Sequence, residues 1–145
     1  MPAGYLALLM IHFLGLALGV GTSFAMLRLG MAARALPEGE RAAFMIRASA
    51  VAKNGGIGLG LSLLSGIAML FMRGVGSVFA AGGGAFHAKL TFVVLLSGVL
   101  GYSQALTKRA REAGGGPALA ALPKAGAALL VLGLAVIVSA VIAFQ

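Results

Sequence analysis

Residues 86–106 read FHAKLTFVVLLSGVLGYSQAL. The stretch is almost wholly apolar, and at ~1.5 Å per residue it is long enough to cross the ~30 Å hydrocarbon core of a bilayer. It nevertheless begins with two ionisable residues, His87 and Lys89. The chain has 2 histidines, and the other one, His12, also lies within an apolar run. These two segments therefore carry most of the chemistry that the sequence places at membrane depth.

The composition is typical of a membrane protein. Of the 145 residues, 61% are hydrophobic, and the mean hydropathy is +1.07. A soluble domain of this size has too little interior to bury so much apolar surface. The apolar runs predict an all-α fold, an integral membrane four-helix bundle that forms a single domain over residues 1–145. Its helices are expected at residues 4–29, 50–72, 86–107 and 123–144.

The connections between these helices have different compositions. Residues 34–47 are charged and predict a solvated loop that leads into a helix, with Glu38 and Glu40 favourably placed at its start. Residues 73–85 are rich in glycine and predict a flexible hairpin on the membrane surface. Residues 114–117 predict a glycine turn. The first helix is expected to stay in the mature protein, because MPAGY lacks the positive charge of a signal peptide.

The net charge of +8 and the absence of cysteine limit the function classes. Without cysteine, disulfides, thiolate metal sites, iron–sulfur clusters and covalent c-type haem are excluded. The basic residues occupy loops and helix ends rather than a face that would bind nucleic acid, so no nucleic-acid partner is expected.

The basic residues also predict the topology. One side of the bundle holds most of them: Arg28, Arg34, Arg41, Arg47, Lys53, Lys108, Arg109, Arg111 and Lys124. Only Arg73 and Lys89 fall on the other side. The first side is therefore predicted to be cytoplasmic, which makes the chain an N-out/C-out, multi-pass protein of the inner (cytoplasmic) membrane.

Small residues recur at helical spacing in the first two segments: Gly15, Gly19, Gly58, Ser62 and Gly66. Such stripes let a neighbouring helix, or a flat cofactor, come close. The fourth segment carries no ionisable residue after Lys124 and is expected to serve packing only.

A histidine at membrane depth is costly unless it is partnered, so both histidines are functional candidates. One interpretation is axial ligation of a haem held between the first and third helices. Nearby glycines would make room for the ring, and basic residues at the outer edge would meet its propionates. The site then comprises His12, His87, Lys89, Arg73, Gly15, Gly19 and Gly98, with His12 and His87 as metal ligands.

Two other interpretations remain open. Thioether and imidazole groups suit Cu(I), and Met10, Met69 and Met72 stand near the outer ends of their segments. Alternatively, each histidine only hydrogen-bonds to a neighbouring helix. The glycine stripes also fit a homo-oligomer or a non-catalytic subunit of a larger membrane complex.

Two patches resemble the HemJ-type protoporphyrinogen oxidase and CopD-like superfamily of small four-helix membrane proteins. They are MIHFLGLALGVG at residues 10–21 and FHAKLTFVVLLSGVLGY at residues 86–102. The resemblance implies haem b bound within the helices and oxidation of protoporphyrinogen. It puts His12 first among the haem ligands, with His87 and Lys89 lining the same site. CopD-type relatives are linked instead to copper uptake.

We therefore expect a haem b-binding membrane redox protein that contacts lipid and accepts a quinone or a porphyrinogen as a small-molecule partner. If it is an enzyme, it is expected to be a membrane oxidoreductase similar to protoporphyrinogen oxidase. The alternative is a non-catalytic subunit of a membrane complex or a CopD-like copper-transport component. The residues alone do not decide between these classes.

Overall fold

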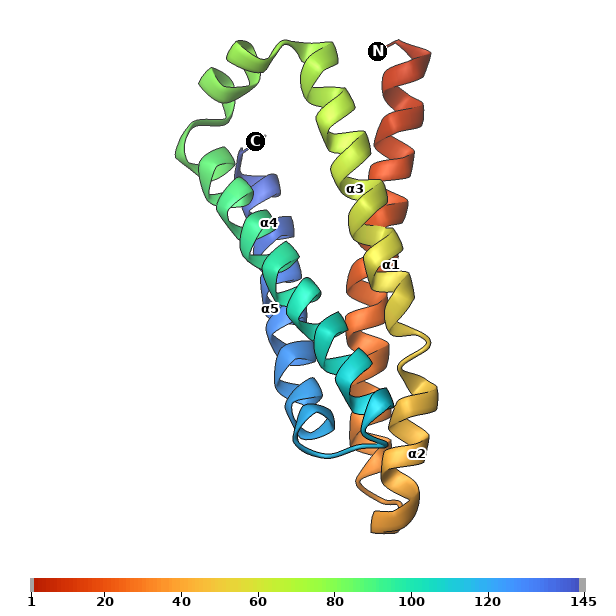
Figure 1. The fold of residues 1–145 in the computed structure, drawn as a ribbon. Coiled ribbons are helices and arrows are strands. Elements are labelled where there is room, and N and C mark those ends of the chain that lie inside the picture. The colour runs from red at the N-terminus through yellow and green to blue at the C-terminus, as the bar shows by residue number, and fades with distance from the viewer. Residues whose placement is uncertain (1, 144–145) are drawn as a thin grey trace.

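A computed structural model describes residues 2–143 of the chain. These residues fold into five helices: α1 (Ala3–Ala33), α2 (Glu38–Ala48), α3 (Ala52–Arg73), α4 (Val75–Glu112) and α5 (Pro117–Ala143) (Figure 1). The described residues contain no β-strand. Four segments are long and apolar enough to cross a membrane: α1, the α2–α3 unit, α4 and α5. The predicted all-α architecture with four segments of spanning length is confirmed, and it indicates a multi-pass membrane protein.

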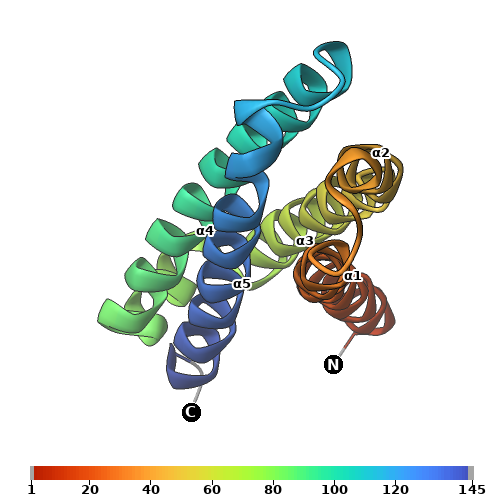
Figure 2. The ribbon, with the colours of Figure 1, turned by 90° about the horizontal axis from the view of Figure 1, so that it is seen from below.

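The helices form two pairs. α1 packs along α3 and α4 packs along α5, whereas the contacts of α1 with α5 and of α3 with α4 are less extensive. The pairs approach each other near α2 and separate toward the end where α1 begins (Figure 1). Seen along the bundle, they form two distinct groups (Figure 2). The first and third predicted segments therefore belong to different pairs.

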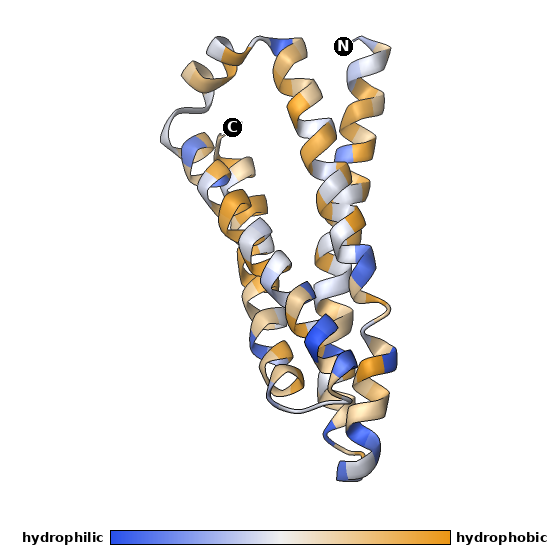
Figure 3. Cartoon of the chain, in the orientation of Figure 1, coloured by the Kyte–Doolittle hydropathy of each residue, from blue (hydrophilic) through white to orange (hydrophobic). Residues whose placement is uncertain are grey.

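Large apolar side chains cover the outside of the bundle. The exposed fractions of Leu64, Phe71 and Val94 are 72%, 71% and 71%. Hydrophobic residues dominate the long middle part of the bundle, and hydrophilic residues gather at the end that holds α2 (Figure 3). So much exposed apolar surface is a liability in water but is what a lipid-facing bundle requires.

α1 and α3 touch through their backbones. A Cβ atom added to Gly15 would lie 2.6 Å from the Gly58 carbonyl oxygen, and one added to Gly58 would lie 2.6 Å from the Gly15 carbonyl oxygen. Any larger residue at either position would force the helices apart. The predicted small-residue stripes thus do permit a close helix approach.

The basic connection between the first two spanning units contains a helix. Within the expected loop at 34–47, α2 begins directly after Pro37, with Glu38 and Glu40 in its first turn. Carboxylates at this position interact favourably with the helix dipole. The helical start in this connection was therefore expected correctly, and the helix expected at 50–72 corresponds to α3, Ala52–Arg73.

A turn at residues 49–51 separates α2 from α3. The Ser49 side chain lies in this turn and is only 2% exposed. Its hydroxyl donates to the Ile46 carbonyl at 2.6 Å and accepts hydrogen bonds from Nη2 and Nε of Arg111, at 3.0 and 3.2 Å. This contact ties the α2–α3 turn to the end of α4.

The glycine-rich connection differs most from its prediction. Instead of a flexible hairpin over 73–85, α4 begins immediately after Gly74, whose φ is 83°. Ser77 Oγ donates to the carbonyl oxygens of Arg73 and Gly74, at 2.6 and 2.8 Å, and so satisfies backbone groups at the end of α3. The prediction was wrong because the hydrogen bond of Ser77 and the packing of Phe86 beside Gly82 favour helix, which outweighs the weak helix propensity of glycine.

α4 is interrupted once and α5 starts early. Gly83 has φ 50° and ψ −147°, a conformation that glycine adopts at little cost.

The predicted turn at 114–117 is confirmed in part, since Gly114 to Gly116 all have positive φ. α5 starts at Pro117 rather than near residue 123, and Pro123 lies inside it. The predicted end of this helix at Phe144 lies outside the described residues.

Candidate functional site

A cavity of about 580 Å³ lies between the two helix pairs. α1, α3, α4 and α5 all contribute to its lining, which is mostly apolar and includes Leu16, Leu96 and Val136. The polar and charged lining residues are few: Tyr5, His12, Ser23, Ser62, Arg73 and Lys89. An apolar cavity with a small number of placed polar groups is the usual form of a cofactor or small-molecule site.

His12, on α1, lines this cavity and is held by α3. Its Nδ1 atom lies 2.8 Å from the carbonyl oxygen of Ser62. A carbonyl oxygen can only accept, so Nδ1 donates and carries the proton of the neutral ring. Ser65 Oγ, which donates to the Leu61 carbonyl at 2.6 Å, is a second acceptor for Nδ1 at 3.2 Å. Nε2 is then the ring nitrogen with a lone pair, as a metal-binding imidazole requires.

Two further contacts fix the ring. Ser62 Oγ donates to the His12 carbonyl oxygen at 3.2 Å, so the two residues form a reciprocal pair of hydrogen bonds. A Cβ atom added to Gly66 would lie 3.2 Å from Cε1 of His12. The ring therefore lies across Gly66, and α3 sets both its position and its orientation.

Two basic residues line the cavity. Arg73 is the last residue of α3, at the end where the helix pairs separate, and its guanidinium carbon lies 4.9 Å from the centroid of the Tyr5 ring on α1. Lys89, on α4, is half-buried and lines the same cavity as His12. Positive charges at an apolar cavity suit a ligand with acidic substituents.

The glycines predicted to make room for a cofactor have different surroundings. Gly19 lines the cavity, and an added Cβ would meet nothing within 4 Å. Gly15 also lines it, but the space beside its Cα is filled by Ser62 of α3, so this glycine serves helix packing. Gly98 is not among the described residues that line the cavity.

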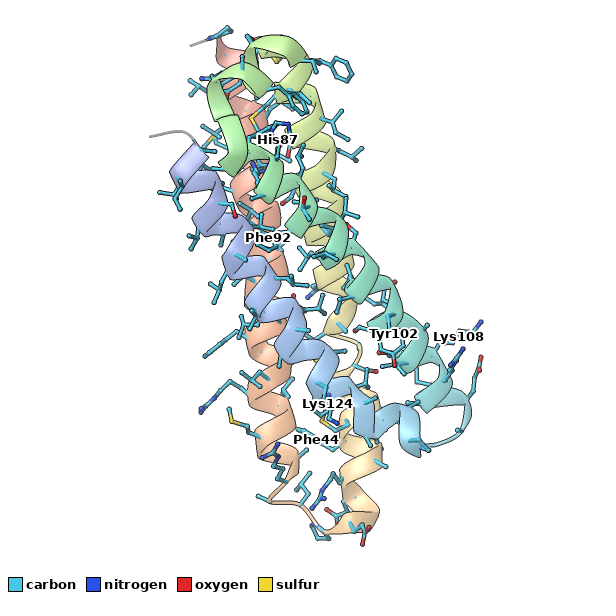
Figure 4. All side chains as sticks on the ribbon, turned by 90° about the vertical axis from the view of Figure 1, so that its left-hand side faces the viewer. Phe44, His87, Phe92, Tyr102, Lys108 and Lys124 are labelled. Atoms are coloured by element: carbon cyan, nitrogen blue, oxygen red, sulfur yellow. The ribbon has the colours of Figure 1, made fainter. Side chains whose placement is uncertain are left out.

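His87 is not among the described residues that line the cavity. Its side chain is exposed, its Nδ1 atom lies 2.8 Å from the Gly83 carbonyl oxygen, and its ring packs edge-on against Phe79. Figure 4 shows it near the start of the long part of α4. The imidazole thus supports the break in α4 at Gly83. The expected arrangement, with His87 facing His12 across one cofactor, stays a prediction.

The methionines that motivated a copper site are scattered. Met69 lines the cavity, whereas Met10 and Met72 are 74% and 51% exposed. Within residues 2–143, no group of three or more His, Cys, Asp or Glu residues is placed to hold a metal ion. A haem iron makes a smaller demand on the chain, because the porphyrin supplies four ligands and the protein only the axial ones.

The structure adds two features that sequence reasoning did not assign. α5 lines the cavity with Gly133 and Val136, although residues 123–144 were expected to serve packing only. Ser62 and Ser65 hold the His12 ring. The sequence could have indicated this role, because both serines lie on the small-residue face of an apolar segment, and serines at such positions hydrogen-bond across helices.

Comparison with protein-family models, with curated proteins and with solved structures found no match to this chain. The function is therefore inferred from the geometry of the cavity, the held imidazole and the two basic residues that line the same space.

Proposed function

We propose that the protein binds haem b in the cavity between the helix pairs and acts as an integral membrane redox protein. The observation that carries this proposal is the hydrogen bond from Nδ1 of His12 to the Ser62 carbonyl. Metal-binding histidines usually donate their other ring N–H to a carbonyl or carboxylate, which fixes the tautomer and raises the basicity of the ligand nitrogen. His12 Nε2 would then bind the haem iron.

The cavity suits a flat, largely apolar ring. Its volume of about 580 Å³ lies within the range of roughly 300–1,000 Å³ that cofactor sites occupy. Gly19 leaves part of the lining open, Arg73 and Lys89 would pair with the propionates, and the apolar lining would keep water from the iron. Bound haem would supply one-electron redox chemistry, while the chain binds, orients and shields it.

A more specific proposal comes from the resemblance to HemJ-type proteins: oxidation of protoporphyrinogen, with electrons passed to a quinone. A porphyrinogen carries the same kind of propionate groups as haem, so Arg73 and Lys89 would position either molecule by the same charge pairing. Both porphyrinogen and quinone dissolve in lipid, which is the environment of the bundle.

We further propose an N-out/C-out orientation in the inner (cytoplasmic) membrane. The basis is the excess of Lys and Arg at one end of the bundle, together with the positive-inside rule. Arg34, Arg41 and Arg47 belong to or flank α2, at the end where hydrophilic residues gather (Figure 3). In this orientation, Arg73 and the start of α1 lie toward the outer face.

An absorption spectrum of the full chain, purified in detergent and titrated with hemin, tests the proposal. The expected result is stoichiometric uptake with a Soret band, and sharp α and β bands after reduction with dithionite. A protein that stays colourless and takes up no hemin would overturn it. In that case, bound copper would favour the CopD-like alternative, and no metal at all would favour a structural subunit.

A further inference from the structure

A second pocket, of about 700 Å³, lies at the basic end of the bundle. It lies between the start of α3 and the last turns of α4, and the residues that line it include Ser49, Lys53, Ile57, Gln104, Lys108 and Arg111. Within the described chain, no residue lines both this pocket and the one that contains His12. The second pocket therefore has no part in the proposed haem site.

The charges in this pocket are predominantly positive. The lining contains three basic residues, Lys53, Lys108 and Arg111, and a single acidic residue, Glu112. The ammonium nitrogen of Lys108 and the carboxylate of Glu112 are 3.9 Å apart, and both side chains are largely exposed, so solvent weakens this pair. The pocket keeps an excess of positive charge and is suited to an anion.

Parts of the pocket are fixed by contacts between helices. Arg111 donates two hydrogen bonds to the buried Ser49 hydroxyl, which holds the plane of the guanidinium and leaves other N–H groups for a ligand. A Cβ atom added to Gly56 would lie 2.9 Å from Nε2 of Gln104, so the amide of Gln104 lies close against α3. The two contacts bring donors from α4 to the α2–α3 turn and to the first turns of α3.

The pocket also has an apolar side, which faces the middle of the bundle. Ile57 is one turn beyond Lys53 on α3 and is 58% exposed. Figure 4 shows Lys108 near the end of α4, with Tyr102 further along the same helix toward the middle of the bundle. A ligand here would meet positive charge at one end and apolar surface at the other.

We propose that this pocket binds the phosphate group of an anionic ligand, and that the ligand is the headgroup of an anionic phospholipid whose acyl chains lie along Ile57. Basic pockets between transmembrane helices commonly bind anionic lipid headgroups, because charge and burial of the chains act together. Free phosphate shares the headgroup chemistry but gains nothing from the apolar side.

The test titrates the full chain in detergent with short-chain phosphatidylglycerol, and separately with phosphatidylcholine of equal chain length and with inorganic phosphate. The readout is the shift of the thermal midpoint of each protein relative to its own ligand-free value. Native mass spectrometry of the same samples counts bound lipid and does not depend on stability. The variant is Lys53→Gln/Lys108→Gln. The matched control, Arg109→Gln/Lys124→Gln, removes the same charge from exposed residues outside the pocket.

We expect phosphatidylglycerol to bind in preference to phosphatidylcholine. The pocket variant should bind it roughly 25-fold more weakly, since each of the two lysines strengthens binding about fivefold. The control variant should bind like the unchanged protein. Equal weakening in both variants, equal binding of the two lipids, or no binding at all would overturn the site. Binding of inorganic phosphate as tight as that of the lipid would overturn the lipid assignment.

Discussion

The Nδ1 atom of His12 lies 2.8 Å from the carbonyl oxygen of Ser62, although the two residues are 50 positions apart in the chain. The Ser62 hydroxyl returns a hydrogen bond to the His12 carbonyl at 3.2 Å. The acceptor of the imidazole proton is a backbone atom, so its position is set by how closely α1 approaches α3. The tautomer and the direction of Nε2 therefore depend on the packing of two glycine-lined helices.

Gly15→Ala is expected to destabilise the contact between α1 and α3. The new Cβ would lie 2.5 Å from Ser62 Oγ and 2.6 Å from the Gly58 carbonyl oxygen, which is part of the backbone and cannot turn aside. We expect a loss of about 1–3 kcal/mol in the free energy of unfolding, measured by denaturation in mixed detergent.

Gly21→Ala is the control for this change. It lies on the same helix, and an added Cβ would meet nothing within 4 Å. Its effect should stay within about 0.5 kcal/mol. Equal losses in both variants would contradict the close approach of the two backbones.

Gly66→Val is expected to displace the His12 ring. The Cβ alone would lie 3.2 Å from Cε1 of His12, and the γ carbons would add bulk beside the ring. Hemin binding should weaken about tenfold, or ~1.4 kcal/mol, with a shifted Soret band. Gly60→Val, on the same helix but with open space at its Cβ, should bind hemin normally. Normal binding in both variants would mean that this ring is not held where the ligand binds.

Arg73→Gln and Lys89→Gln are each expected to weaken hemin binding by about two- to fivefold, since a partly exposed ion pair contributes at most ~1 kcal/mol. Arg28→Gln removes the same charge outside the cavity and should have no effect. Haem dimethyl ester, which lacks free carboxylates, should bind all four proteins equally. If the unchanged protein binds the ester as tightly as haem, neither basic residue pairs with a propionate.

Ser49→Ala is expected to loosen the basic end of the bundle. The change removes the acceptor of two Arg111 hydrogen bonds at a side chain that is 2% exposed. We expect a loss of about 1–2 kcal/mol in the free energy of unfolding. Thr91→Ala removes an exposed hydroxyl that bonds only within its own helix, to the His87 carbonyl, and should stay within about 0.5 kcal/mol. A Ser49 variant as stable as the Thr91 variant would argue against this link.

The spanning segments could be predicted because the length of an apolar run is dictated by membrane thickness. The starts of α4 and α5 could not be predicted, whereas α3, Ala52–Arg73, lies close to its predicted bounds of 50–72. The glycines of 73–85 suggested a loop, yet the rings of Phe79 and Phe86 pack edge-on at 5.1 Å, and the side chain of Phe86 fills the space beside Gly82. Both contacts form within α4 itself and favour helix over the local preference of glycine.

The candidate site could be predicted only in part. His12 stood out because it is an ionisable residue deep in an apolar run. Its partner Ser62 is distant in sequence, and several glycine stripes offered equally good packing faces. The placement of His87 depends on the break at Gly83, which brings a backbone carbonyl within 2.8 Å of its ring.

The most direct test of the haem proposal compares hemin binding by His12→Ala and His87→Ala, measured by absorbance titration of the two purified full-length variants. His12→Ala should weaken binding at least about 100-fold and abolish the spectrum of a histidine-ligated haem. His87→Ala, which changes an exposed imidazole outside the cavity, should keep the affinity and spectrum of the unchanged protein. An unchanged spectrum in His12→Ala would contradict the assignment of His12 as the ligand.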